Sequence, residues 1–139
     1  ATRLVCTCDA FGLPIVFLID SPGPSAEPGP GISRAMMLAQ AVQLAEVPKC
    51  WVITGRAQGA GLLVTGPARI ATDLVIAWPD ARAGYDDGSA TADEHHWAAD
   101  GIVSPADTRA ALAAHLHAVL GPSPVSRPGR TLCTWPVGF

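Results

Sequence analysis

The sequence predicts an α/β fold in which a mostly parallel sheet is flanked by helices. Segments with helical periodicity alternate with short apolar segments of strand length. Strands that are joined through helices form parallel βαβ units with right-handed crossovers. The chain has 139 residues, which suits one domain. We therefore expect a domain over residues 1–121 and a proline-rich tail over residues 122–139.

The first predicted elements are a helix and a strand. Residues 3–11 have the spacing of a helix end, and Gly12 followed by Pro14 is a typical stop signal. Residues 14–20 then form an apolar run with no alternation of polar side chains. A run of this kind is typical of a strand that is covered on both faces, so we expect packing layers on each side of it.

The central predicted elements are a loop, a helix, a strand and a turn. Residues 21–31 are rich in proline and glycine, which predicts a loop. Residues 32–46 have the periodicity of an amphipathic helix, and residues 49–54 form a second apolar strand. The glycine-rich segment 55–61 predicts a turn, and a short helix is expected at about 60–70.

The last predicted elements are a strand and a helix with a polar segment between them. Residues 73–78 form a third apolar strand, and residues 80–94 are expected to be a surface loop. The final helix has Ser104 as its expected N-cap and Pro105 at the first helical position. Gly121 is expected to end this helix. Three predicted strands make a small sheet, which indicates a missing half or a partner.

Composition narrows the classes of function. The chain is 49% hydrophobic and only 15% charged, below the roughly 25% of ordinary soluble domains. Its net charge of −3 argues against a nucleic-acid partner. No apolar run reaches the ~18 residues of a membrane span. The four cysteines lack metal-ligand spacing, and we interpret them as buried thiols of a cytoplasmic protein.

The glycine-rich turn is the strongest chemical candidate. Gly55, Gly59 and Gly61 do not match the dinucleotide or phosphate-loop patterns. Main-chain N–H groups at a helix start near Ala60 would lack helical partners and could stabilise an oxyanion. An ordinary strand-to-helix turn, with glycine serving close packing, remains the alternative.

Other titratable residues give weaker signals. His95 and His96 are adjacent, so their side chains diverge on a helix, and a surface position is expected. Asp86 and Asp87 are also neighbours and are expected in a solvated loop. Ser21 lacks the glycine context of a nucleophile elbow.

A series of short motifs resembles one protein family in the same order along the chain. The sequence is similar to the C-terminal domain of the carboxyltransferase subunit of propionyl-CoA and acetyl-CoA carboxylases, which are biotin-dependent. The matching segments are residues 8–14, 20–23, 47–54, 55–60, 73–79, 100–109 and 127–130. The resemblance implies a crotonase-like fold, the ClpP-like ββα superhelix, and makes residues 1–121 a shortened C-terminal half of a carboxyltransferase.

The resemblance also implies an activity and a site. The implied reaction moves a carboxyl group from carboxybiotin to the α-carbon of an acyl-coenzyme A thioester. By resemblance, the N–H groups of Gly59 and Ala60 form the oxyanion hole on the biotin side. The residues that would line the biotin pocket are Gln58, Gly61, Leu63, Asp86 and Asp87. The thioester side belongs to the family's N-terminal half.

This sequence departs from the family at several of these positions. Ala60 stands where the family has a second glycine, which requires a negative φ at this residue. Gln58 replaces a tyrosine, and Leu63 replaces an acidic residue. Asp86 and Asp87 replace a Met-Gly pair, and two carboxylates would repel carboxylated biotin.

Three functional hypotheses follow. The first is a carboxyltransferase subunit completed by an N-terminal-type subunit or by a homo-oligomer, and served by a biotin carrier protein. The second is a non-catalytic crotonase-like subunit with a structural or regulatory role in a complex. The third is a CoA-ester hydrolase, isomerase or decarboxylase with Asp86 or His95 as acid or base. No nucleic acid, membrane or metal is expected in any of them.

Overall fold

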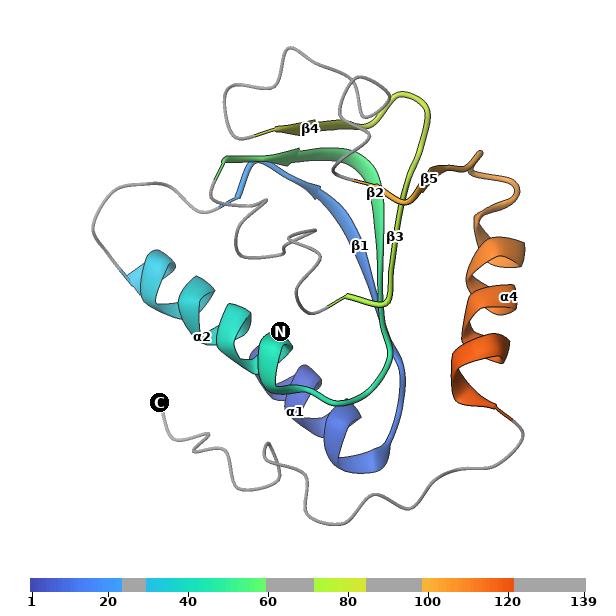
Figure 1. Cartoon of the computed structure of the whole chain (residues 1–139). Coiled ribbons are helices and arrows are strands. Elements are labelled where there is room, and N and C mark those ends of the chain that lie inside the picture. The colour runs from blue at the N-terminus through green and yellow to red at the C-terminus, as the bar shows by residue number, and fades with distance from the viewer. Residues whose placement is uncertain (24–29, 60–71, 85–98, 122–139) are drawn as a thin grey trace.

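The computed structural model describes residues 1–23, 30–59, 72–84 and 99–121. Helices and strands alternate in these segments, as the sequence predicts (Figure 1). The elements are α1 (Thr2–Phe11), β1 (Ile15–Ser21), α2 (Pro30–Leu44), β2 (Lys49–Gln58), β3 (Leu74–Ala77), β4 (Arg82–Gly84), β5 (Gly101–Ile102) and α4 (Thr108–Leu120). The predicted helix at 60–70 and the tail over 122–139 lie outside the described residues.

The strands form a five-stranded sheet in which every pairing is parallel. The order along the main path is β1-β2-β3-β5, and β4 pairs with the later part of β2. This architecture confirms the predicted parallel sheet with flanking helices. The sheet contains more strands than the three predicted, because β4 and β5 are too short to have a sequence signature.

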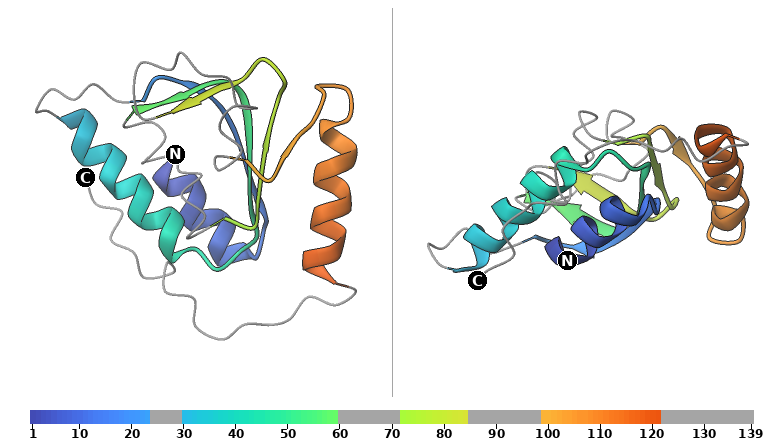
Figure 2. Two further views of the ribbon diagram at one scale, coloured as in Figure 1. Left: turned by 45° about the horizontal axis from the view of Figure 1, so that its top comes forward. Right: turned by 90° about the horizontal axis from the view of Figure 1, so that it is seen from below.

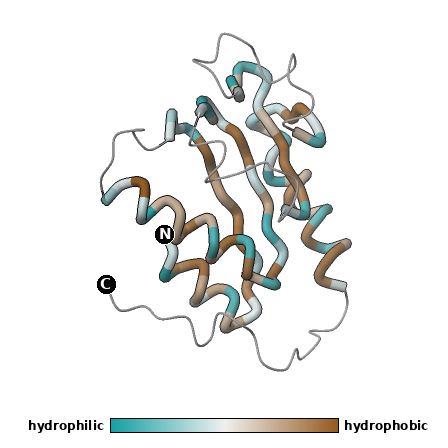
Figure 3. The backbone as a smooth tube through the Cα atoms, turned by 60° about the vertical axis from the view of Figure 1, so that its left-hand side comes forward, coloured by the Kyte–Doolittle hydropathy of each residue, from teal (hydrophilic) through white to brown (hydrophobic). Residues whose placement is uncertain are grey.

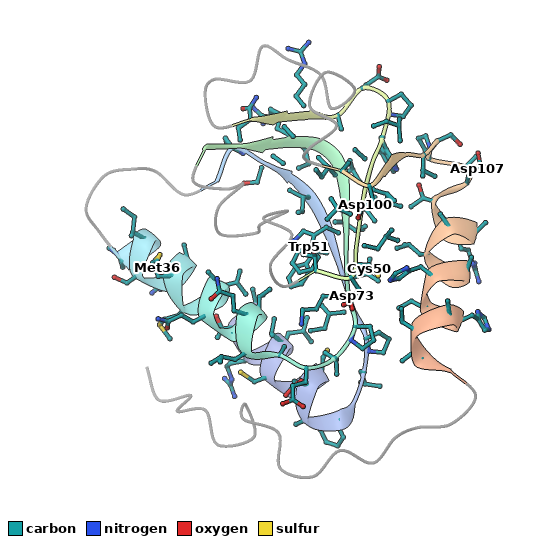
Figure 4. The ribbon with its side chains drawn as sticks, viewed as in Figure 1. Met36, Cys50, Trp51, Asp73, Asp100 and Asp107 are labelled. Carbon is teal, nitrogen blue, oxygen red and sulfur yellow. The ribbon has the colours of Figure 1, made fainter. Side chains whose placement is uncertain are left out.

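One face of the sheet, called here the first face, carries the main hydrophobic core. The register places Phe17 beside Trp51 and Ile19 beside Ile53, so these side chains share a face. Trp51 is fully buried and stacks on Phe17 with ring centroids 4.7 Å apart. Helices α1 and α2 cover this face and contribute Val5 and other buried side chains to the same cluster (Figures 1 and 4).

The opposite face, called the second face, is covered only in part. The register aligns Leu18 with Val52 and Val52 with Ile76 on this side. Val52 and Ile76 are buried, but Leu18 is 71% exposed and Val16 is 40% exposed. Helix α4 lies on this side of the sheet and has no buried residue (Figure 2). The expectation that both faces of β1 are covered is therefore wrong for the second face.

Hydrophobic residues run along the central parts of the strands (Figure 3), yet two predicted element boundaries need correction. Strand β2 continues through Gln58 instead of ending at residue 54, because its later part pairs with β4. The segment predicted as a turn from residue 55 is thus largely strand. Likewise, β4 lies inside the segment that we predicted to be a loop at 80–94.

The helix ends follow the predicted signals, with one shift. Gly12 caps α1 in the left-handed conformation, with φ 70°, and Gly121 follows α4 with φ 61°. The last helix begins at Thr108, after a turn in which the Ser104 hydroxyl accepts the Asp107 N–H at 3.2 Å. Ser104 therefore caps the turn before the helix, and the predicted helix start is three residues too early.

A buried polar cluster ties α1, α2 and β2 together at the amino ends of the strands. Asp9 is fully buried, and its Oδ1 accepts the Glu46 N–H at 2.7 Å. Lys49 is 7% exposed, and its Nζ donates to the Ala45 carbonyl. Burial lowers the pKa of Lys49, while Asp73, Asp9 and Glu46 oppose that shift. These groups hold the helix ends to the sheet.

Two of the three cysteines that the structure describes are buried, as the sequence predicts. Cys6 and Cys50 are buried free thiols, and Cys8 is a half-buried free thiol. Burial raises the pKa of Cys6 and raises that of Cys50 to about 11. The thiols of Cys6 and Cys50 therefore remain protonated at neutral pH and act as small apolar groups.

Candidate functional site

A bulge between β1 and β2 marks the carboxyl end of the sheet. Ile19 pairs with Ile53, but the next pair along β1 is Ser21 with Ala57. Strand β1 thus advances two residues while β2 advances four. Asp20 lies opposite the extra β2 residues. Bulges of this kind bend a strand and are common next to functional sites.

The Asp20 carboxyl group holds this bulge in shape. Its Oδ1 accepts the Arg56 main-chain N–H at 2.9 Å, and the Arg56 Nε lies 3.8 Å from the same oxygen. The carboxyl group occupies the space that a Cβ at Gly55 would need. The Thr54 hydroxyl donates to the Ile19 carbonyl at 3.1 Å, which fixes the other side of the bulge. Position 55 therefore needs a glycine, because any larger residue would overlap the Asp20 carboxyl group.

The bulge lets β2 exchange one neighbour for another. Before the bulge β2 pairs with β3, and after it Arg56, Ala57 and Gln58 pair with Arg82, Ala83 and Gly84 of β4. Figure 1 shows β2 curving over the top of the sheet along this path. The last residue of β2, Gln58, therefore lies at the carboxyl edge of the sheet, where open α/β sheets bind their ligands.

Gly59 follows β2 directly and has a left-handed backbone. Its φ is 52°, a conformation that costs a non-glycine residue roughly 1–2 kcal/mol. A second left-handed glycine, Gly23 with φ 84°, follows β1, and its N–H donates to the Ser21 hydroxyl at 3.0 Å. Two glycine corners therefore follow the neighbouring strands β1 and β2. Such corners can present main-chain N–H groups to an anion.

Only part of the predicted site falls within the described residues. Gln58 and Gly59 are both half-buried and adjacent at the end of β2. The other predicted site residues lie outside the described segments; they are Ala60, Gly61, Leu63, Asp86 and Asp87. Their roles, and the roles of Gln58 and Gly59, stay predictions.

Sequence reasoning missed the residues that shape the corner. Asp20, Gly55 and Arg56 form one unit across two strands, 36 residues apart at its widest hydrogen bond. The available signal was an aspartate at the end of one apolar strand and a glycine at the end of the next. Parallel strands place such positions side by side, so the pair could have been proposed from the pattern.

The described segments contain neither a metal-binding cluster nor a membrane-spanning helix. No group of three or more His, Cys, Asp or Glu side chains there could hold a metal ion. No helix of that part of the chain is long and apolar enough to cross a membrane. The buried cluster of Asp9 and Lys49 lies at the opposite end of the sheet, where β2 begins, and serves packing.

Comparison with known proteins decides the family. The carboxyl transferase domain matches residues 1–93, which is more than half of the chain. The chain belongs to the carboxyltransferase family. This match includes the bulge at Asp20 and the corner at Gly59. The fold and the sequence resemblance stated above are thus confirmed.

Curated members of the carboxyltransferase family align with the same region. The acetyl-/propionyl-coenzyme A carboxylase beta5 subunit of Mycobacterium tuberculosis is 41% identical over 86 residues, which cover 59% of this chain and 16% of that protein. The propionyl-CoA carboxylase beta chain of Saccharopolyspora erythraea is 39% identical over 88 residues, with the same coverage. The chain therefore spans about one-sixth of the length of these relatives.

Solved carboxyltransferase structures match the fold over most of the chain. A transcarboxylase 12S subunit with hydrolysed methylmalonyl-coenzyme A bound has a TM-score of 0.72 and 28% identity, covering 94% of this chain and 31% of that subunit. The beta subunit of Pseudomonas aeruginosa geranyl-CoA carboxylase has a TM-score of 0.70 at 20% identity, covering 84% of this chain and 34% of that subunit, and supports the fold alone.

Proposed function

We propose that this chain supplies the biotin side of an acyl-CoA carboxyltransferase, in which a carboxyl group moves from carboxybiotin to an acyl-coenzyme A. The observation that carries the proposal is the left-handed Gly59 corner, held beside the bulge that Asp20 organises. Family membership supports the reaction class, because the relatives are named as biotin-dependent acetyl-/propionyl-coenzyme A carboxylase subunits.

The corner is suited to hold negative charge on the biotin ureido oxygen. The N–H groups of Gly59 and Ala60 are the proposed donors, and one preorganised donor of this kind is worth roughly 3–4 kcal/mol in a transition state. When bound, biotin supplies the carboxyl group and a ring nitrogen that can accept the substrate's α-proton. The chain's own residues then orient the ring and stabilise charge, so no side-chain base is required. Gln58, Gly61, Leu63, Asp86 and Asp87 are the proposed lining of the pocket.

The acyl-coenzyme A site is proposed to come from another carboxyltransferase segment. The chain covers only 16% of its curated relatives, so an N-terminal-type subunit or a further copy in a homo-oligomer would have to complete the catalytic unit. A separate carrier protein would bring biotin. The described thiols are free, which supports a reducing, cytoplasmic location as part of the same proposal.

The test compares two glycines that both have left-handed backbones. Gly59→Ala and Gly12→Ala each place an L-residue at a left-handed position, with φ 52° and 70°. Both should lose roughly 1–2 kcal/mol of stability. Carboxylation of propionyl-CoA is measured after mixing with N-terminal-type carboxyltransferase subunits and a biotinylated carrier. Gly59→Ala should lower turnover about 100-fold, because a shifted corner misplaces its N–H groups. Gly12→Ala, at the end of α1, should leave turnover unchanged.

The outcomes distinguish a role of Gly59 in the reaction from a general effect of backbone strain. Equal turnover losses in the two variants would show that strain alone was measured. Wild-type turnover that survives Gly59→Ala in full would remove the proposed corner from the reaction. No turnover with any partner subunit would reject the enzyme and leave the second candidate function.

That second candidate is a non-catalytic subunit that stabilises a carboxylase assembly. The exposed apolar residues Val16 and Leu18 favour it, because such surfaces suit contact with another chain. In that case the purified chain should raise the thermal stability of its partner subunit without raising turnover. Differential scanning calorimetry of the mixture distinguishes this result from catalysis.

A further inference from the structure

Two arginines lie side by side near the carboxyl edge of the sheet, where β4 runs along the later part of β2 (Figure 1). Arg56 of β2 is in register with Arg82 of β4, and both residues are exposed. Residues in register on neighbouring strands point to the same face, and such strands lie about 4.8 Å apart. Ala57 and Ala83, the next pair along this ladder, are fully buried on the opposite face. The two guanidinium groups therefore share one exposed surface, called here the arginine pair.

The described residues neutralise the arginine pair only in part. Within that part of the chain, the Arg82 side chain forms no hydrogen bond or ion pair. Arg56 has one ion-pair partner there, because its Nε lies 3.8 Å from the Asp20 Oδ1. That oxygen also accepts the Arg56 main-chain N–H at 2.9 Å, so the Asp20 carboxyl group is already held in the bulge. Two positive charges thus face one negative charge, and like charges directly opposite on neighbouring strands repel each other. A bound anion would remove this repulsion.

The position of the arginine pair places it close to the candidate site. Gln58 is two residues beyond Arg56 on β2, so the two side chains lie on the same face of the strand. Gly59, which forms the left-handed corner, follows Gln58 directly. The ladder between β2 and β4 starts only after the bulge, so the same bulge that leads to Gly59 also brings Arg56 beside Arg82. An anion held by the pair would therefore lie at the edge where open α/β sheets bind ligands.

We propose that Arg56 and Arg82 form a binding site for a doubly charged phosphate group. A guanidinium group carries five N–H donors in a fixed fork and binds phosphate through two parallel hydrogen bonds. A phosphate dianion has enough oxygens to meet both forks and enough charge to balance both arginines, whereas a carboxylate can satisfy only one of them. The side chains of this pair are separate from the main-chain N–H groups of the Gly59 corner. The inference therefore does not depend on the proposed reaction.

Free phosphate and the phosphate monoester of coenzyme A are two sources of such a group, and a titration distinguishes them. The full chain is titrated with inorganic phosphate, coenzyme A and dephospho-coenzyme A at one low ionic strength, because salt screens exposed charges. NMR follows the main-chain amides and the arginine Nε–H groups, and the shifts should gather at Arg56 and Arg82. Coenzyme A that binds more tightly than inorganic phosphate and dephospho-coenzyme A identifies the ester as the ligand. Equal binding of coenzyme A and inorganic phosphate identifies the phosphate group alone.

Matched variants separate the arginine pair from the overall charge of the chain. Arg82→Gln removes one guanidinium group of the pair and should weaken phosphate binding about tenfold, because charge-assisted hydrogen bonds are lost. Arg109→Gln removes the same charge from an exposed position of α4 and should change the affinity less than about twofold. Arg82→Lys keeps the charge but loses the fork, so its loss should be intermediate, about threefold. Isothermal titration calorimetry measures the three affinities.

Thermal unfolding gives a second readout that does not depend on the NMR shifts. A ligand of the folded state raises the Tm, so phosphate should raise the Tm of the wild type and of Arg109→Gln more than that of Arg82→Gln. Arg109→Gln also corrects for the general stabilising effect of phosphate salts. Absence of saturable phosphate binding, shifts that gather away from the pair, or equal losses in Arg82→Gln and Arg109→Gln would each overturn the proposal. None of these measurements requires biotin or turnover, so their failure is distinguishable from failure of the glycine test.

Discussion

The two faces of the sheet differ in how completely the described residues cover them. On the first face, Trp51 and Ile53 are fully buried beneath α1 and α2. On the second face, Val52 is equally buried in the centre, but Leu18 on the adjacent strand is 71% exposed. Helix α4 lies on that side and buries none of its residues (Figure 2). The first face is a complete core, whereas the second is complete only at its centre.

This difference explains why β1 has an apolar sequence on both faces while the structure covers only one. A strand with apolar side chains on both faces is suited to packing on both faces. The described residues provide that packing for only one face of β1. Within the described residues, the side chains of Val16 and Leu18 on the second face of β1 stay 40% and 71% exposed.

The largest expected effect compares one residue from each face. Trp51→Ala removes a fully buried ring that stacks on Phe17, and should lower the free energy of unfolding by about 3–5 kcal/mol. Leu18→Ala removes a mostly exposed side chain and should cost less than about 0.5 kcal/mol. Urea unfolding monitored by circular dichroism measures both values. Equal costs for the two variants in the isolated chain would contradict the division into a complete and an incomplete face.

Much of the fold could be predicted because it follows from local patterns. Apolar runs located β1, β2 and β3, and glycine signals located the ends of α1 and α4. The extension of β2 and the presence of β4 could not be predicted, because both depend on pairing between strands. The covering of β1 was misjudged for the same reason, since the sequence of one strand does not show which elements pack against its two faces.

The sequence predicted the position of the glycine corner at the candidate site, but not the contacts that shape it. The glycine-rich segment indicated Gly59, and its φ of 52° is consistent with a glycine requirement. The sequence pattern could have suggested that Asp20 and Gly55 lie close together, but only the register of β1 against β2 shows the bulge in which they meet. A register shift depends on how two strands pair, so the residue pattern of one segment cannot predict it.

The second expected effect measures how well the second face excludes water near the start of β2, at Cys50. Burial, reinforced by Asp73, raises the pKa of Cys50 from its ordinary 9.0 to about 11. The folded state therefore holds this proton where the unfolded chain releases it, so the stability contributed by Cys50 is present below pH 9 and is lost as the pH rises towards 11. At about 1.4 kcal/mol per pKa unit, the loss is at most about 3 kcal/mol.

Cys50→Ala is the matched variant for this measurement. The pKa of Lys49 is lowered, so Lys49 contributes in the opposite direction, with stability rising as the pH approaches 10.5. Lys49 is present in both proteins, and the difference between their unfolding free energies from pH 8.5 to 11 isolates Cys50. A difference that does not change with pH would mean that water reaches Cys50 and that the second face is open near the start of β2 too.

The smallest expected effect concerns the bulge where the strands reach the candidate site. A Cβ at Gly55 would overlap the Asp20 carboxyl group, whose Oδ1 is fixed by the Arg56 N–H. Gly55→Ala should therefore cost about 1–2 kcal/mol in the wild-type chain and much less in an Asp20→Ala background. A double-mutant cycle by urea unfolding measures this coupling.

Arg56→Ala provides the control for that cycle. The Arg56 and Asp20 side chains are 58% and 62% exposed and 3.8 Å apart, so their ion pair should contribute less than about 0.5 kcal/mol. Coupling of Gly55 to Asp20 should survive in the Arg56→Ala background, because the Arg56 main-chain N–H remains. If the coupling disappears with the arginine side chain, the ion pair and not the main-chain contact shapes the bulge. The position of Gly59 would then depend on an interaction that salt weakens.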